Sequence, residues 1–177
     1  MVKAKEFWEY LCNELNYRFF AGVPCLGLKP LYDTMSSKFM HYVPAVNERV
    51  ALGLVNGANI ADIKSAVLMD SKNILDLSNL LISFNKEYEI PTLVICYDEG
   101  YKKCSHVSNL LKSFNTVYLN DKGTFEKSLK YITKKIEKEN KPGIFFIHMS
   151  IKRIKPGFYR FKSLWRNPDF CIRMIFF

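Results

Sequence analysis

The chain of 177 residues fits one domain with a normal core, because 49% of its residues are hydrophobic and 24% are charged. This composition excludes a disordered protein, and without an apolar run long enough to cross a bilayer or a signal-peptide core we expect a cytoplasmic protein with no membrane partner. Five scattered cysteines argue against a disulfide framework, and the net charge of +9 suits an anionic partner: a nucleic acid, an acidic subunit or a small anionic substrate.

Strands and helices alternate along the first 150 residues. Apolar residues at helical spacing predict an amphipathic helix over residues 3–15, and the buried strand that follows ends in a loop at Gly22 and Pro24. The further predicted elements are a helix at 28–35, a strand at 40–46, a helix at 47–62, strands at 65–69, 89–97 and 115–119, a helix at 122–140 and a strand at 143–148. This alternation predicts an α/β fold, a doubly wound and mostly parallel six-stranded sheet with helices on both faces.

The stretch from His41 to Gly57 joins a strand to a helix. Asn47 is suited to begin the helix, because its side-chain oxygen can accept a hydrogen bond from a free amide of the first turn. Glu48 follows at a position where the helix dipole favours a carboxylate, and a glutamate there is most often only an electrostatic cap. Small residues would let this helix pack closely against a sheet or a partner: Ala51, Gly53, Ala58 and Ala61.

Ligand sites of doubly wound sheets lie beyond the carboxyl ends of the strands. Four segments of this chain fall at those ends: Gly22–Cys25, Glu48, Asp70–Asn73 and Tyr97–His106. The strand pattern alone therefore predicts that these segments converge on one site.

Other kinds of site receive less support from the sequence. Residues 151–177 form a basic and aromatic tail, which could bind single-stranded nucleic acid but more often docks on its own domain or on a partner. No recognised motif accompanies the tail, so we do not expect a nucleic-acid partner. Cys104 and His106 fit no standard zinc spacing, and no third group completes a Cys–His nucleophilic pair, so we expect no metal ligands in this chain.

The run Asn47-Glu48, followed by Ala51 and Gly57, resembles the pyrimidine-binding (α-type) domain of thiamine-diphosphate-dependent decarboxylases. The resemblance covers about residues 5–150 and is strongest to phosphonopyruvate decarboxylase and to the α subunit of sulfopyruvate decarboxylase. The Gly22-Val23-Pro24 loop and the segment around His106 match as well. One departure is serious, because Asn73 and Leu75 stand where the family has the glycines of a Gly-rich loop.

The resemblance implies a set of site residues. Glu48 and His106 would be catalytic, with Glu48 contacting and activating the aminopyrimidine ring of the cofactor. The cofactor-binding residues would be Gly22, Val23, Pro24, Asn47, Glu48, Asp70, Ser71 and Asn73. The cofactors would be thiamine diphosphate and Mg²⁺, with the diphosphate and the metal held mainly by a partner chain.

The implied function is that of one half of a two-chain enzyme. With a separate pyrophosphate-domain (β-type) subunit, the chain would decarboxylate phosphonopyruvate or sulfopyruvate to the corresponding aldehyde, as a homodimer or a higher oligomer. The small anionic 2-oxo acid substrate agrees with the positive net charge. The alternative is a catalytically degenerate relative that acts as a regulatory or scaffold partner, which the two lost glycines favour.

Overall fold

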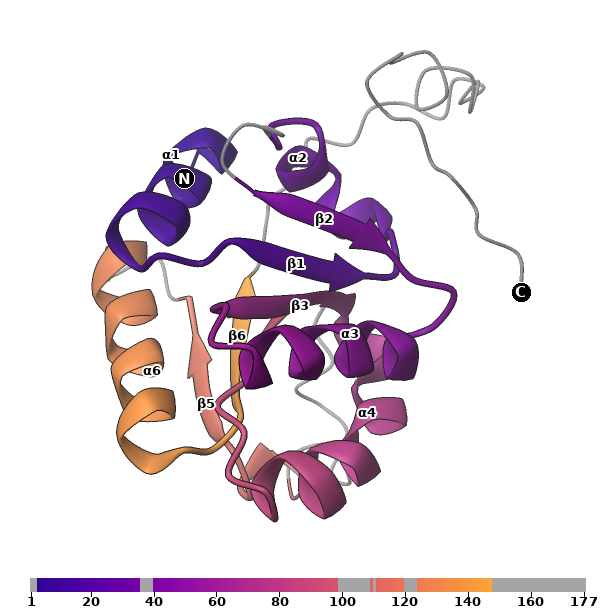
Figure 1. The fold of residues 1–177 in the computed structure, drawn as a ribbon. Coiled ribbons are helices and arrows are strands. Elements are labelled where there is room, and N and C mark those ends of the chain that lie inside the picture. Colours follow the sequence, from indigo (N-terminus) through magenta and orange to yellow (C-terminus); the bar gives the residue numbers. More distant parts are fainter. Residues whose placement is uncertain (1–2, 36–39, 99–108, 110, 120–123, 148–177) are drawn as a thin grey trace.

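The computed structural model describes residues 3–35, 40–98, 109, 111–119 and 124–147. These residues form a six-stranded sheet in the order β2-β1-β3-β4-β6-β5, and every neighbouring pair of strands is parallel. The predicted fold class is confirmed. All the strands point the same way, as Figure 1 shows for β1, β2 and β3, so their carboxyl ends lie along one side of the sheet, which is called the carboxyl edge below.

The elements follow the predicted alternation, with one further helix, α4, between the strands predicted at 65–69 and 89–97. The strands are β1 (Phe19–Gly22), β2 (His41–Pro44), β3 (Ser65–Asp70), β4 (Leu93–Tyr97), β5 (Asn115–Tyr118) and β6 (Gly143–Ile147). The helices are α1 (Ala4–Glu9), α2 (Lys29–Tyr32), α3 (Glu48–Ile60), α4 (Ile74–Leu80) and α6 (Phe125–Glu139). Two of them continue as π-helical turns, α1 through Tyr10–Glu14 and α4 through Leu81–Lys86.

Helices cover both faces of the sheet, as the pattern predicts. Alternate strand residues point to opposite faces, so Leu68 and Phe145 enter one core while Met69 and Phe146 enter the other. The first core lies against α1, α2 and α6, and the second lies against α3 and α4 (Figure 1). The site-bearing helix α3 is thus fixed to the sheet through the buried residues Ala51, Leu52 and Val55.

The end of β1 approaches its neighbour very closely. A Cβ atom added at Gly22 would lie 2.0 Å from the carbonyl oxygen of Leu68 in β3. Backbone atoms of a central strand cannot move aside as a flexible side chain can, so this position requires glycine for the sheet itself.

Several boundaries differ from the predicted ones for local reasons. Strand β4 begins at Leu93 rather than at Glu89, because Glu89 has a φ of 53° and so cannot be extended. Helix α6 ends where Asn140 adopts a left-handed conformation with a φ of 49°. The predicted helix at 28–35 is shorter and follows a 3-10 turn at Leu26–Leu28.

None of the described helices is both long and apolar enough to span a bilayer.

Candidate functional site

The site lies at the carboxyl edge of the sheet, where β1, β2, β3 and β4 end side by side. Gly22 is in register with Pro44 on one side and with Leu68 on the other, and Asp70 is in register with Tyr97. The loops that follow these strands therefore leave the sheet next to one another. This confirms the parallel strand order from which the sequence predicts a site here, and the site itself stays a prediction.

Glu48 is the central polar group of this edge. It occupies the first turn of α3 and is only 7% exposed, which is unusual for a carboxylate that merely caps a helix. Its Oε1 atom accepts a hydrogen bond from Nδ2 of Asn73, which lies in the loop after β3. The structure thus brings together two of the predicted site residues that are 25 positions apart in the sequence.

Asn47 has the capping role that the sequence predicts. Its Oδ1 atom accepts a hydrogen bond of 2.9 Å from the amide of Val50, and the residue itself is exposed. This bond fixes the start of α3 and hence the position of Glu48. The described contacts of Asn47 therefore indicate a structural role, and direct contact with a cofactor stays a prediction.

Asp70 and Ser71 lie at the end of β3. Oδ1 of Asp70 accepts a hydrogen bond of 3.0 Å from the amide of Lys72 and so caps the 3-10 turn of Ser71–Asn73. The Ser71 hydroxyl is buried and has no hydrogen-bond partner among the described residues. Buried hydroxyl groups normally have a partner, so Ser71 is an exception among the described residues of this edge.

The loop after β1 is held by two tyrosines that the sequence analysis missed. The hydroxyl of Tyr42 donates a 3.0 Å hydrogen bond to the carbonyl of Gly22, and that of Tyr32 donates a 3.5 Å bond to the carbonyl of Val23. Their ring centroids are 5.5 Å apart, and burial raises the pKa of both hydroxyls, that of Tyr42 to about 12. Both hydroxyls therefore stay protonated donors at neutral pH, and no short motif signals their long-range contacts.

The nearby thiols do not have the properties of a nucleophile. Burial raises the pKa of the Cys25 thiol, and burial raises that of Cys96 well above its usual value. Among the described residues no group of three or more His, Cys, Asp or Glu side chains is arranged to hold a metal ion. The predicted catalytic residue His106, together with Cys104 and the basic tail, lies outside the described residues.

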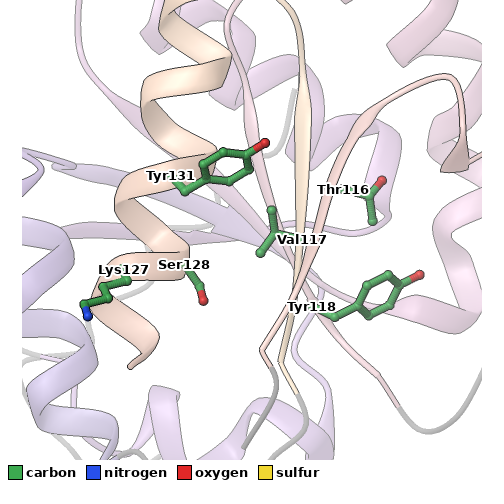
Figure 2. Close-up of a pocket in the computed structure, with 6 residues that line it drawn as sticks. All are labelled: Thr116, Val117, Tyr118, Lys127, Ser128 and Tyr131. Carbon is green, nitrogen blue, oxygen red and sulfur yellow. The ribbon is translucent and has the colours of Figure 1, made fainter. Parts of the chain in front are cut away.

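A separate hollow lies beside the outermost strand β5, between β5 and α6 (Figure 2). It has a volume of about 410 Å³ and is lined by Thr116, Val117, Tyr118, Lys127, Ser128 and Tyr131. In Figure 2, Val117 points toward α6, whereas Thr116 and Tyr118 point the other way. Because the polar groups do not converge on one point, we do not assign a ligand to this hollow.

Comparison with known proteins finds relatives of one kind. The sulfopyruvate decarboxylase α subunit of Methanocaldococcus jannaschii is 36% identical over 89 residues, which cover 50% of this chain and 53% of that protein. The same subunit of Methanococcus maripaludis is 30% identical over 83 residues, which cover 46% of this chain and 50% of that protein. The matches therefore span about half the length of these curated relatives. No model of a protein family matches the chain.

Two solved structures share the fold. A 2-oxoglutarate:ferredoxin oxidoreductase from Magnetococcus marinus superposes with a TM-score of 0.64 at 15% identity, covering 83% of this chain and 29% of that one. A putative thiamin diphosphate-dependent enzyme from Mycobacterium smegmatis gives a TM-score of 0.60 at 11% identity, with coverages of 83% and 30%. The chain is thus similar in sequence to sulfopyruvate decarboxylase α subunits over about half its length, and it shares the fold of a part of each of the two solved structures.

Proposed function

We propose that the chain is the α-type subunit of a thiamine-diphosphate-dependent 2-oxo acid decarboxylase that acts on sulfopyruvate, with phosphonopyruvate as the second candidate substrate. The observation that carries this proposal is the buried carboxylate of Glu48 at the carboxyl edge of the sheet. The similarity to sulfopyruvate decarboxylase α subunits supports the choice of substrate.

The residues at the edge fit the aminopyrimidine end of the cofactor. Such a ring needs a buried carboxylate beside a ring nitrogen and hydrogen-bonding groups around its amine, and Glu48 and the unpaired hydroxyl of Ser71 provide both kinds of group. Glu48 would hold a proton shared with the ring nitrogen. The Gly22–Pro24 loop, held by Tyr32 and Tyr42, would form a wall of the site.

Thiamine diphosphate, when bound, supplies the electron sink on which a 2-oxo acid loses carbon dioxide. The contribution of this chain is to place the Glu48 carboxylate and to shield it from water. Burial favours this role, because an electrostatic contact is stronger where water is excluded.

The rest of the site would come from a separate pyrophosphate-domain (β-type) subunit that holds the diphosphate and Mg²⁺. The name "subunit alpha" of the similar proteins supports such an assembly. We also propose that two copies of this chain pair through α3, whose outer face is apolar and open.

Decarboxylation by the reconstituted complex tests the proposal. Carbon dioxide release from sulfopyruvate is expected only when the chain, its co-purifying β-type subunit, thiamine diphosphate and Mg²⁺ are all present, and omission of any one should abolish it. Pyruvate, which has the 2-oxo acid but not the second anionic group, is the matched control substrate and should react poorly. An inactive but fully assembled complex would support the catalytically degenerate alternative, which the side chains of Asn73 and Leu75 favour.

A further inference from the structure

The side chain of Asn73 is used in an unusual way for its position. Asn73 is the N-cap residue of α4, where an asparagine ordinarily accepts a hydrogen bond from an amide of the first turn. Here the side chain makes no capping bond and instead donates Nδ2 to Oε1 of Glu48 in the first turn of α3. The contact thus links the 3-10 turn after β3 to the first turn of α3.

The local backbone does not require a glycine at residue 73. Ser71–Asn73 form a 3-10 turn capped by Asp70, and Asn73 has a φ of −98° and a ψ of 10°. Among the described non-glycine residues, those with positive φ all lie in other loops. A side chain is therefore accommodated at residue 73 without backbone strain. A glycine there would lack the side-chain amide that donates to Glu48.

The hydrogen bond has a direct consequence for the carboxylate. A bond from a neutral amide to an ionised oxygen is charge-assisted and stronger than a neutral pair. It fixes the rotation of the Glu48 carboxylate through Oε1, while no described residue donates a hydrogen bond to Oε2. One oxygen is thus held by Asn73, and the other has no donor among the described residues.

We propose that Asn73 is a positioning residue that acts through Glu48, orienting its carboxylate so that Oε2 faces the ring nitrogen of the cofactor. This inference rests on the proposed function, and it assigns a compensating role to a side chain that replaces a loop glycine. The altered loop would then preserve the catalytic geometry by a different contact.

A double-mutant cycle in the reconstituted complex tests this role. Asn73→Ala should lower kcat roughly tenfold in the parent, which is the scale of a lost charge-assisted hydrogen bond. In the Glu48→Gln background the same change should lower kcat less than about twofold, because the carboxylate to be positioned is already gone.

Two further variants complete the test. Asn73→Asp, of the same size but without a donor, should lower kcat more than Asn73→Ala does, because it places a second carboxylate beside Glu48. Asp76→Asn, in the exposed first turn of α4, is the matched control and should keep parental activity.

A second readout needs neither cofactor nor partner. In ¹⁵N-labelled chain alone, the side-chain amide signals of Asn73 should shift strongly in Glu48→Gln and stay in place in Asp76→Asn. Three results would each overturn this inference. The first is Asn73 side-chain amide signals that do not move in Glu48→Gln. The others are an equal loss of kcat from Asn73→Ala in both backgrounds and a gain of activity in Asn73→Ala. An inactive parent complex whose Asn73 amide still responds to Glu48→Gln would instead overturn the proposed function, and with it the positioning role.

Discussion

Replacing Glu48 by glutamine is expected to lower decarboxylation by the assembled complex at least roughly a hundredfold, the scale of losing a proton-transfer group. Glutamine preserves the size of the side chain and an oxygen that can accept from Asn73, but it can neither carry the charge nor hold the proton. The measurement is kcat under saturating sulfopyruvate and thiamine diphosphate, so that a change in affinity does not hide the change in rate.

The same substitution should leave the fold intact. Removing one carboxylate from the first turn of α3 costs at most about 1 kcal/mol through the helix dipole, and the Asn47 cap remains. The thermal midpoint should therefore fall by only a few degrees. Asp76→Asn makes the same chemical change at an exposed first turn and should keep parental activity. If Glu48→Gln retains activity within twofold of the parent, the proposed role of Glu48 is wrong.

Replacing Gly53 by phenylalanine is expected to disrupt a homodimer that forms through α3. The outer face of this helix is open, because a Cβ added at Gly53 or Gly57 meets nothing within 4 Å. Beside them Val50 is 43% and Leu54 39% exposed, which is a substantial apolar surface for one helix. Ala51, by contrast, is buried in the core of its own chain and cannot contribute to an interface.

The size of the effect follows from symmetry. Overpacking a contact typically costs about 1–3 kcal/mol, and a two-fold axis repeats the change in both copies, so the dissociation constant should rise about thirtyfold or more. The single chain should remain folded, since phenylalanine favours a helix more than glycine does and its Cβ atom meets nothing within 4 Å at this position.

Sedimentation or light scattering across a range of concentrations measures this change. Lys130→Phe adds the same ring to an exposed position of α6, on the opposite face of the sheet, and should leave the dimer unchanged. A parent chain that is monomeric at high micromolar concentration would contradict the proposed pairing. A dimer that tolerates Gly53→Phe would place the interface elsewhere.

The sequence pattern predicts the sheet well because both faces are buried. Strands such as Ser65–Asp70 and Gly143–Ile147 read as continuous apolar runs, as parallel strands covered on both sides do. The start of α3 could also be predicted, since the asparagine cap depends only on residues within one turn.

The details of the site could not be read in the same way. The contact between Asn73 and Glu48 depends on the order β2-β1-β3, which places the loops after β2 and β3 near each other. From the sequence alone Asn73 is only a lost glycine, whereas in the structure it is a donor to the central carboxylate. The sequence also does not signal the π-helical turn at Leu81–Lys86, whose buried Asn85 is bonded to Asn56, 29 positions earlier, and to Thr92.

We propose that this chain supplies only the pyrimidine half of a thiamine diphosphate site, and titration calorimetry can show whether it does. With Mg²⁺ present, thiamine diphosphate should bind the complex with its β-type subunit at micromolar or lower concentration. It should give no measurable heat of binding with this chain alone. Micromolar binding by the chain alone would contradict the half-site, and so would a stable complex that does not bind the cofactor.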